Sequence, residues 1–82
     1  MAKLFQVGIY SSDKTIYAGE VVSLVAPSVA GYLGILAEHA PMVVKLSSGR
    51  ITLRFPAGNT LIIDSSGGGF LEVAKDQVSL LL

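Results

Sequence analysis

The feature that most constrains the fold of this chain is a hydrophobic pattern that repeats every two residues. Residues 50–55 read Arg-Ile-Thr-Leu-Arg-Phe, so polar and apolar side chains alternate along the segment. Because successive side chains of a β-strand point to opposite faces, the pattern predicts a strand with one buried and one solvated face. Residues 56–59 have the composition of a turn, and we expect residues 60–64 to return as the second strand of a hairpin.

Two segments near the N-terminus also have the character of strands. In residues 3–10, apolar side chains alternate with small or polar ones, and residues 11–14 supply a turn. Residues 15–26 form a long run rich in β-branched residues, with apolar side chains on both faces. We expect this run to be a strand that is either covered on both sides or bulged near Gly19 and Glu20.

Strand-like segments return at the end of the chain. Residues 70–74 and 77–82 predict a last hairpin around Lys75 and Asp76. The final residues are apolar, so we expect either that a further segment follows or that this strand is central and held on both sides. Since no window shows helical spacing, the predicted fold class is all-β: a sandwich or flattened barrel, in a single domain over residues 1–82.

The composition favours a subunit of a larger assembly over a free-standing soluble enzyme, with a dense core under a thin polar shell as the alternative. Hydrophobic residues make up 51% of the chain and charged residues only 15%, against about 25% in an average protein. A domain of 82 residues cannot bury all of this material, so apolar surface should remain exposed. The net charge of zero argues against nucleic-acid binding and against a basic membrane-binding patch. The lack of cysteine excludes disulfides and thiolate metal sites.

One uncharged stretch, residues 21–37, requires a check for a membrane span. It is shorter than the roughly 20 residues that a spanning helix needs, and Pro27, Gly31 and Gly34 interrupt it. We interpret it as a buried strand followed by a loop. The N-terminus lacks the pattern of a signal peptide, which leads us to expect a protein that faces the cytosol.

The residues that could carry chemistry do not combine into a catalytic site. His39 stands beside Glu38 and could act as a general base, but no nucleophile can be assigned to it, so we expect a structural or interface role. The carboxylates show no metal-ligand spacing, and we predict neither a metal nor another cofactor. The glycines at 67–69 precede a strand and not a helix, and therefore predict a tight turn instead of a phosphate loop.

An alternative function from another class rests on Lys14. Lipoyl and biotinyl carrier domains are β-sandwiches of similar size that display a modified lysine in a hairpin turn, and Lys14 lies in a predicted turn with Asp13. In those carriers the lysine lies near mid-chain between two similar halves. Here it lies near the start of the chain and the halves differ, so the carrier reading is the second hypothesis. A generic β-sandwich adaptor is the third.

The most distinctive segment is residues 31–42, which is too apolar for an ordinary solvated loop. Its pattern G-x-L-G-I-L-x-x-H-A-P resembles the signature of the ε subunit of F-type ATP synthases, which corresponds to the mitochondrial δ subunit. Three further segments are similar to that family in the same order: Tyr-Ala-Gly-Glu-Val at 17–21, Val-Ala-Pro at 25–27 and Gly-Gly-Phe-Leu-Glu-Val at 68–73. The likeness covers almost the whole chain.

This resemblance implies a function as well as a fold. It implies a sandwich of about ten strands at the foot of the central stalk, in contact with the γ subunit and the polar loops of the c-ring. Such a subunit rotates with them, helps to couple proton or sodium flow to ATP synthesis, and holds no catalytic residue. The implied location is the cytoplasmic face of the bacterial plasma membrane, or the equivalent organellar face, with membrane contact only through the complex.

Two departures from the family bear on the site. Many members carry an acidic residue where this chain has Tyr32, at a position associated with the c-ring, so an aromatic contact would replace a charged one. Most members also continue into a C-terminal helical hairpin that has no counterpart here, so we predict neither ATP binding nor ATPase inhibition. The resemblance implies the following contacts with γ or the c-ring: Ser11, Tyr32, Glu38, His39, Ala40, Pro41 and Met42.

Overall fold

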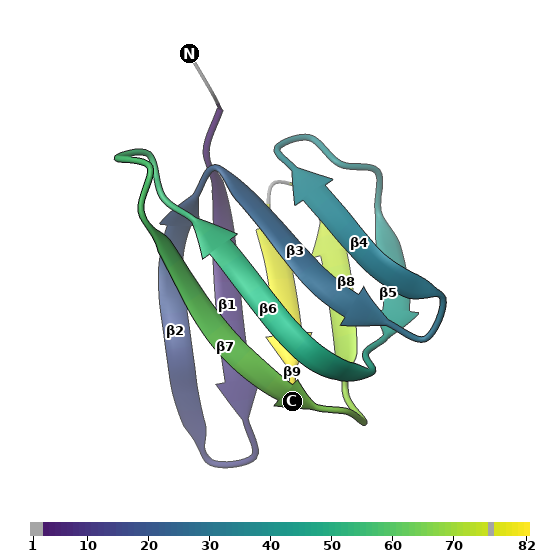
Figure 1. Cartoon of the computed structure of the whole chain (residues 1–82). Helices are drawn as coiled ribbons and strands as arrows, with labels where there is room; N and C mark the ends of the chain where they lie inside the picture. The colour runs from purple at the N-terminus through teal and green to yellow at the C-terminus, as the bar shows by residue number, and fades with distance from the viewer. Residues whose placement is uncertain (1–2, 76) are drawn as a thin grey trace.

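The structure is a computed structural model that describes residues 3–75 and 77–82, and its described residues form two β-sheets packed face to face (Figure 1). A five-stranded sheet has the order β2-β1-β9-β8-β5, and a four-stranded sheet has the order β4-β3-β6-β7. Neighbouring strands are antiparallel except β1 and β9, which are parallel. The strands are β1 (Phe5–Ser11), β2 (Lys14–Val21), β3 (Ser23–Ser28), β4 (Gly31–Leu36), β5 (Met42–Lys45), β6 (Ser48–Arg54), β7 (Thr60–Ser66), β8 (Phe70–Ala74) and β9 (Gln77–Leu81).

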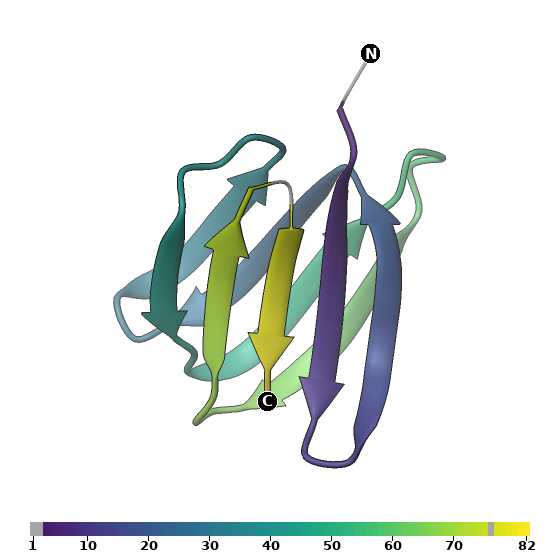
Figure 2. The same cartoon turned by 180° about the vertical axis from the view of Figure 1, so that it is seen from behind.

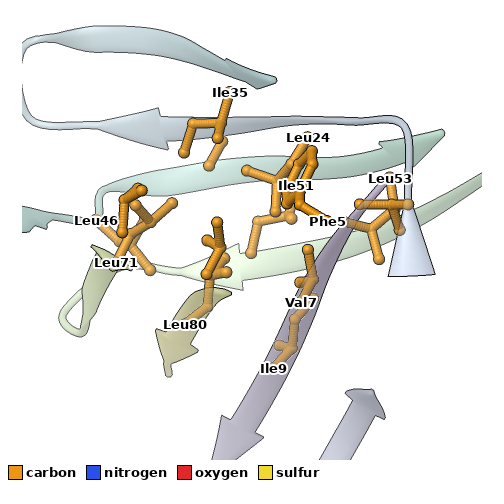
Figure 3. Close-up of a cluster of buried hydrophobic side chains, with 14 residues drawn as sticks. Phe5, Val7, Ile9, Leu24, Ile35, Leu46, Ile51, Leu53, Leu71 and Leu80 are labelled. Atoms are coloured by element: carbon orange, nitrogen blue, oxygen red, sulfur yellow. The ribbon is translucent and has the colours of Figure 1, made fainter. Parts of the chain in front are cut away.

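The core lies between the sheets and is built from the inward-facing side chain of every second residue (Figure 3). Val7 and Ile9 of one sheet face Leu24 and Leu53 of the other, and all four side chains are buried. Burying one such aliphatic side chain contributes about 1.5–3 kcal/mol relative to leaving it in water. The full set of buried hydrophobic residues is Phe5, Val7, Ile9, Val21, Leu24, Ala26, Ile35, Leu46, Ile51, Leu53, Leu71, Val73, Val78 and Leu80.

The predictions of fold class and of two hairpins are confirmed. The chain is an all-β sandwich, with nine strands in its described part where the family resemblance implies about ten. The segment that alternates most clearly forms β6 and pairs with β7 as the expected hairpin. Phe55 falls just after β6 and is half-buried, with its ring 5.8 Å from that of Tyr17. The last hairpin is β8 and β9, although Asp76 of its predicted turn lies outside the described residues.

The prediction for residues 15–26 was wrong. The run is two strands in two different sheets, and the break lies at Val22, where the chain crosses from β2 to β3. Val21 and Leu24 are both buried, a spacing of three that a single strand with one inner face cannot produce. The backbone N–H of Val22 donates to the carbonyl of Arg54 at 2.8 Å, so the amide at the crossing point has a hydrogen-bond partner.

The expected bulge also lies elsewhere. Gly19 is paired with Val7 inside regular β2. The register shifts instead between Ile9, which faces Tyr17, and Tyr10, which faces Thr15, so the extra residue in β2 is at position 16.

The loop expected over residues 31–42 is mostly a strand. Gly31–Leu36 forms β4 and pairs with β3 at all six positions, so only residues 37–41 connect β4 to β5. The prediction of a loop was wrong because two glycines lower the strand propensity of this segment, whereas its pairing with β3 is decided by tertiary contact. The uncharged stretch 21–37 therefore forms β3 and β4. Across the described part of the chain, no helix is long and apolar enough to cross a membrane.

The glycine turn at 67–69 is confirmed, with φ values of 93°, 75° and 127°. These residues carry the chain from β7 of one sheet to β8 of the other. A Cβ on Gly69 would lie 2.1 Å from the carbonyl oxygen of Leu81, so this position needs glycine for space as well as for φ.

The apolar final residues form a central strand that is held on both sides, as one of the two expectations had it. β9 lies between β1 and β8 in the middle of the five-stranded sheet, which Figure 2 presents in front. The N–H of Leu82 still donates to the carbonyl of Tyr10 at 2.8 Å.

Candidate functional site

The residues proposed as partner contacts do not gather at one place. Ser11 ends β1 beside the two-residue turn to β2, at the lower end of the sandwich in Figures 1 and 2. The connection 37–41 between β4 and β5 lies at the upper end in both views. Tyr32 lies near the start of β4, an edge strand of the four-stranded sheet. A partner that touches all of these residues must cover both ends of the molecule, or two partners must share them.

Tyr32 lies on the outer face of its sheet and 64% of it is exposed. Within β4, Leu33 and Ile35 face the core, which leaves Tyr32 and Leu36 facing outward. Tyr32 is paired with Pro27 on β3, and its hydroxyl accepts a hydrogen bond from the backbone N–H of Arg50 at 3.2 Å. The ring therefore lies across β3 and reaches β6.

Gly49 on β6 makes this position of the ring possible. A Cβ at Gly49 would lie 2.6 Å from the Tyr32 hydroxyl and about 3 Å from Pro27. Since the phenol is held at its tip while most of the residue remains exposed, Tyr32 is an ordered apolar surface that a partner can contact without first fixing a flexible side chain.

The connection between β4 and β5 has an ordered backbone. The N–H of His39 donates to the carbonyl of Leu36 at 3.3 Å, and Glu38 adopts a φ of 65°. Glu38 is the one residue other than glycine with positive φ in the described part of the chain. Such a conformation costs a β-carbon-bearing residue about 1–2 kcal/mol, and strain of this kind tends to occur at functional sites.

The side chains of this connection make two polar contacts. Glu38 forms an ion pair with Lys3, which joins the connection to the segment that precedes β1. Both side chains are more than 60% exposed, so the pair contributes little to stability. The Nδ1 atom of His39 lies 2.8 Å from the carbonyl oxygen of Ala40, and because that oxygen can only accept, Nδ1 carries the hydrogen in this contact.

Lys75 joins this group from another part of the chain. A shallow hollow is lined by Glu38, His39, Ala40 and Pro41 together with Lys75, which lies in the turn after β8. The two segments meet because β5 pairs with β8, with Met42 opposite Val73. Sequence analysis assigned Lys75 no role, and no local signal could have done so, since only the β5–β8 pairing brings it near residue 38.

The polar contacts at these positions are an exposed ion pair and hydrogen bonds to backbone groups. Within residues 3–75 and 77–82, no three His, Cys, Asp or Glu residues are close enough together to hold a metal ion. The ring contact of His39 is to a backbone carbonyl and not to a nucleophile.

Exposed apolar side chains lie on the outer faces of both sheets. On the five-stranded sheet, Phe70 and Leu81 are direct cross-strand neighbours and are 51% and 54% exposed. Val43 on β5 is 65% exposed and lies diagonally from Phe70, because it pairs with Glu72. We call these three residues the β5-β8-β9 patch. On the four-stranded sheet, the exposed outward residues are Val25, Tyr32, Leu36 and Ile62.

Known proteins match this chain along its length. The family model of the ATP synthase, Delta/Epsilon chain, beta-sandwich domain matches residues 4–82. The ATP synthase epsilon chain of Dichelobacter nodosus is 41% identical over 81 residues, which are 99% of this chain and 56% of the relative. That of Leptospira interrogans is 39% identical over 80 residues, 98% of this chain and 61% of the relative. The chain thus spans little more than half the length of these relatives.

Solved structures share the fold. A chain of the Euglena gracilis mitochondrial ATP synthase, in a structure of its OSCP/F1/c-ring assembly, superposes with a TM-score of 0.89 at 22% identity, over 95% of this chain and 49% of that one. A chain from the central stalk and c-ring of the Tetrahymena thermophila mitochondrial ATP synthase gives 0.78 at 15% identity, over 98% and 63%. None of these comparisons supports the carrier hypothesis for Lys14, which is the first residue of β2.

Proposed function

The chain belongs to the family of ATP synthase delta/epsilon chain β-sandwich domains, and from this premise we propose that it is a non-catalytic rotor component of an F-type ATP synthase. In this role it joins the γ subunit to the c-ring in the central stalk. It transmits rotation while proton or sodium flow drives ATP synthesis elsewhere in the complex. Its contribution is binding and mechanical coupling, and it supplies no group to the reaction.

The observation that supports this function best is the β5-β8-β9 patch. Phe70, Leu81 and Val43 are each more than half exposed and come from three adjacent strands of one sheet. A cluster of exposed apolar side chains on one face marks a contact surface, and a large aromatic side chain is a frequent energetic centre of protein contacts. We assign this patch to the γ subunit, because a rotor component needs a permanent, largely apolar attachment to the shaft.

The second contact is assigned to the c-ring and is centred on Tyr32. Tyr32 lies on the opposite sheet from the β5-β8-β9 patch, so the two contacts can be made at once. Its ring is held in place through its hydroxyl, and its aromatic surface suits the less polar parts of a loop.

The remaining proposed contacts extend these two surfaces. Met42 begins β5, next to Val43 of the patch, and residues 38–41 lead into it from the end of the sheet. Glu38, His39, Ala40 and Pro41 therefore extend the γ contact around that end, and Lys75 lines the same hollow. Ser11 lies at the other end of the same sheet.

The proposed location follows from the complex. The chain is peripheral and reaches the membrane only through the c-ring, on the cytoplasmic face of a bacterial plasma membrane or the equivalent organellar face. The epsilon chains of Dichelobacter nodosus and Leptospira interrogans, both bacterial, support the first of these.

Titration calorimetry with the cognate γ subunit tests the proposal. Saturable binding with one copy of this chain per γ subunit is the expected result. If the folded chain binds neither γ alone nor γ assembled with the c-ring, the proposed function is wrong, and Lys14 should then be examined by mass spectrometry for a covalent modification.

A further inference from the structure

The sandwich has four edge strands, and they differ in how well they are protected against pairing with another chain. The edges are β2 and β5 in one sheet and β4 and β7 in the other. An edge strand presents unpaired N–H and C=O groups, and proteins protect such edges with charged side chains, above all lysine, with proline, with bulges or with short length. Glycine within a strand also weakens its pairing. β2 carries Lys14 and an irregular register, β4 contains two glycines, and β5 has four residues that include Lys45. β7 is Thr-Leu-Ile-Ile-Asp-Ser-Ser, seven residues in regular register without glycine, proline or lysine, and its one charged residue is Asp64.

The backbone groups that point outward from β7 follow from its pairing with β6. At the closed end of the hairpin, the N–H of Phe55 donates to the carbonyl of Asn59 at 2.9 Å. Hydrogen-bonded and non-hydrogen-bonded pairs alternate along an antiparallel ladder. Residues 61 and 63 therefore bond to β6, whereas Thr60, Ile62 and Asp64 direct their N–H and C=O groups away from the sheet.

These outward groups are arranged symmetrically about Ile62. If a second β7 pairs antiparallel with the first and Ile62 lies on the two-fold axis, then Ile62 faces Ile62 and Thr60 faces Asp64 of the second copy. All three pairs then exchange N–H and C=O groups, because all three residues point outward. Ile62 is 52% exposed on the outer face, so its contact with the second Ile62 buries apolar surface that the monomer leaves in water.

The charged side chains on and beside β7 are also compatible with this antiparallel pairing. Arg54 is the cross-strand neighbour of Thr60, and Arg50 is the neighbour of Asp64. Within the described part of the chain, the ion pair that forms is Lys3–Glu38 and does not involve Asp64. In the paired arrangement, Asp64 of one copy faces Thr60 of the other, so the row across the two hairpins reads Arg50, Asp64, Thr60, Arg54. The pairing thus adds the arginine of the second copy, one strand beyond Thr60, to the Arg50 that already neighbours the carboxylate.

From these observations we propose that β7 is a self-association edge, through which two copies of this chain join their four-stranded sheets in an antiparallel, two-fold pair centred on Ile62. The β5-β8-β9 patch lies on the other sheet and remains free in such a pair. The pair is a state of the free subunit, and it neither requires nor prevents the contact proposed for γ.

Sedimentation velocity over a concentration series measures the association. The chain should show a monomer–dimer equilibrium, and Ile62→Lys should weaken it roughly tenfold or more, because two like charges would then lie opposite each other. Val43→Lys makes the same change on edge strand β5, at a residue of comparable exposure, and should leave the equilibrium unchanged. A chain that stays monomeric at every concentration, or a dimer that Ile62→Lys does not weaken, overturns the proposal.

Chemical cross-linking then tests the two-fold geometry. The chain has no cysteine, so a single introduced cysteine can react only with its copy in another molecule. With a short bis-maleimide, Ile62→Cys should give a cross-linked dimer much faster than Val43→Cys at the same concentration. Equal rates would overturn the pairing at Ile62. Ile62→Lys should still bind γ, so failure of this proposal is distinguishable from failure of the proposed function.

Discussion

At the scale of single residues, the sandwich depends on aliphatic side chains between the sheets and on glycines where the chain turns. Leu53 is fully buried and pairs with Leu24 across β6 and β3. Its neighbours Thr52 and Arg54 face outward, and Thr52 is only half-buried while Arg54 is exposed. We therefore expect substitutions at adjacent positions of this strand to lower the free energy of unfolding by very different amounts.

Leu53→Ala should lower the free energy of unfolding by about 2–5 kcal/mol, through lost burial and the cavity that remains. Urea denaturation followed by circular dichroism measures this loss. Arg54→Ala, one residue away on the solvated face, is the control and should change stability by no more than about 0.5 kcal/mol. Similar losses in the two variants would mean that the inner face of β6 is misassigned.

Gly68 and Gly69 need to be glycine for different reasons, which are backbone conformation at both positions and lack of space at Gly69 alone. Both have positive φ, but a Cβ on Gly68 would meet no atom within 4 Å, whereas a Cβ on Gly69 would collide with the carbonyl of Leu81. Gly68→Ala should cost about 1–2 kcal/mol from φ alone. Gly69→Ala should cost clearly more, because β9 must also shift. Thermal unfolding of the two variants compares their losses of stability. Equal losses would show that the backbone at Gly69 relaxes around the added Cβ without a further loss of stability.

At the scale of elements, β4 connects the fold to the proposed function. It is an edge strand whose inward residues Leu33 and Ile35 pack on the core while Tyr32 and Leu36 remain on the surface. A change at Tyr32 can therefore alter recognition without removing the strand. The internal hydrogen bond at risk is the one from the Arg50 N–H, which is worth about 1 kcal/mol.

Tyr32→Asp should thus change affinity for the c-ring while the domain stays folded. The substitution exchanges an aromatic ring for a charge on the exposed outer face of β4. Binding to the isolated ring or to ring-containing membranes measures the effect, with circular dichroism to check the fold. Tyr32→Phe is the matched control, since it keeps the ring and removes only the hydroxyl. Unchanged ring binding in Tyr32→Asp would exclude Tyr32 from the contact.

At the scale of the whole molecule, the two sheets present different outer surfaces, which we propose serve different partners. The β5-β8-β9 patch on one sheet is assigned to γ, and the outer face of the other sheet carries Tyr32 and the edge strand β7. A single shared core holds both surfaces in a fixed relation. A coupling component requires this rigidity, because torque passes from one contact to the other.

Phe70→Ser should weaken γ binding, whereas Ile62→Ser should not. The two residues are almost equally exposed, at 51% and 52%, but lie on opposite outer faces. Calorimetric titration with γ compares them directly, and the loss for Phe70 should be about 2 kcal/mol or more, as expected of an aromatic hot spot. If Ile62→Ser weakens binding and Phe70→Ser does not, the γ contact lies on the four-stranded sheet.

Much of this protein follows from its sequence alone. The period of two determined that the chain forms strands, the turn residues determined where several of them end, and the ordered motifs identified the family. These features are local, because side-chain alternation and positive φ depend on a few consecutive residues. The positions of Ile51, Leu53 and the glycine turn were therefore predictable.

Only the tertiary structure decided how the strands are arranged. It placed the sheet crossing at Val22, made Gly31–Leu36 a strand, set β9 parallel to β1, and brought Lys75 beside the connection at 38–41. Each of these depends on residues far apart in the sequence, and the pairing that buries both inner faces together is selected by the free energy of the whole core. No window of the sequence contains that information, which is why the strands were predictable and their partners were not.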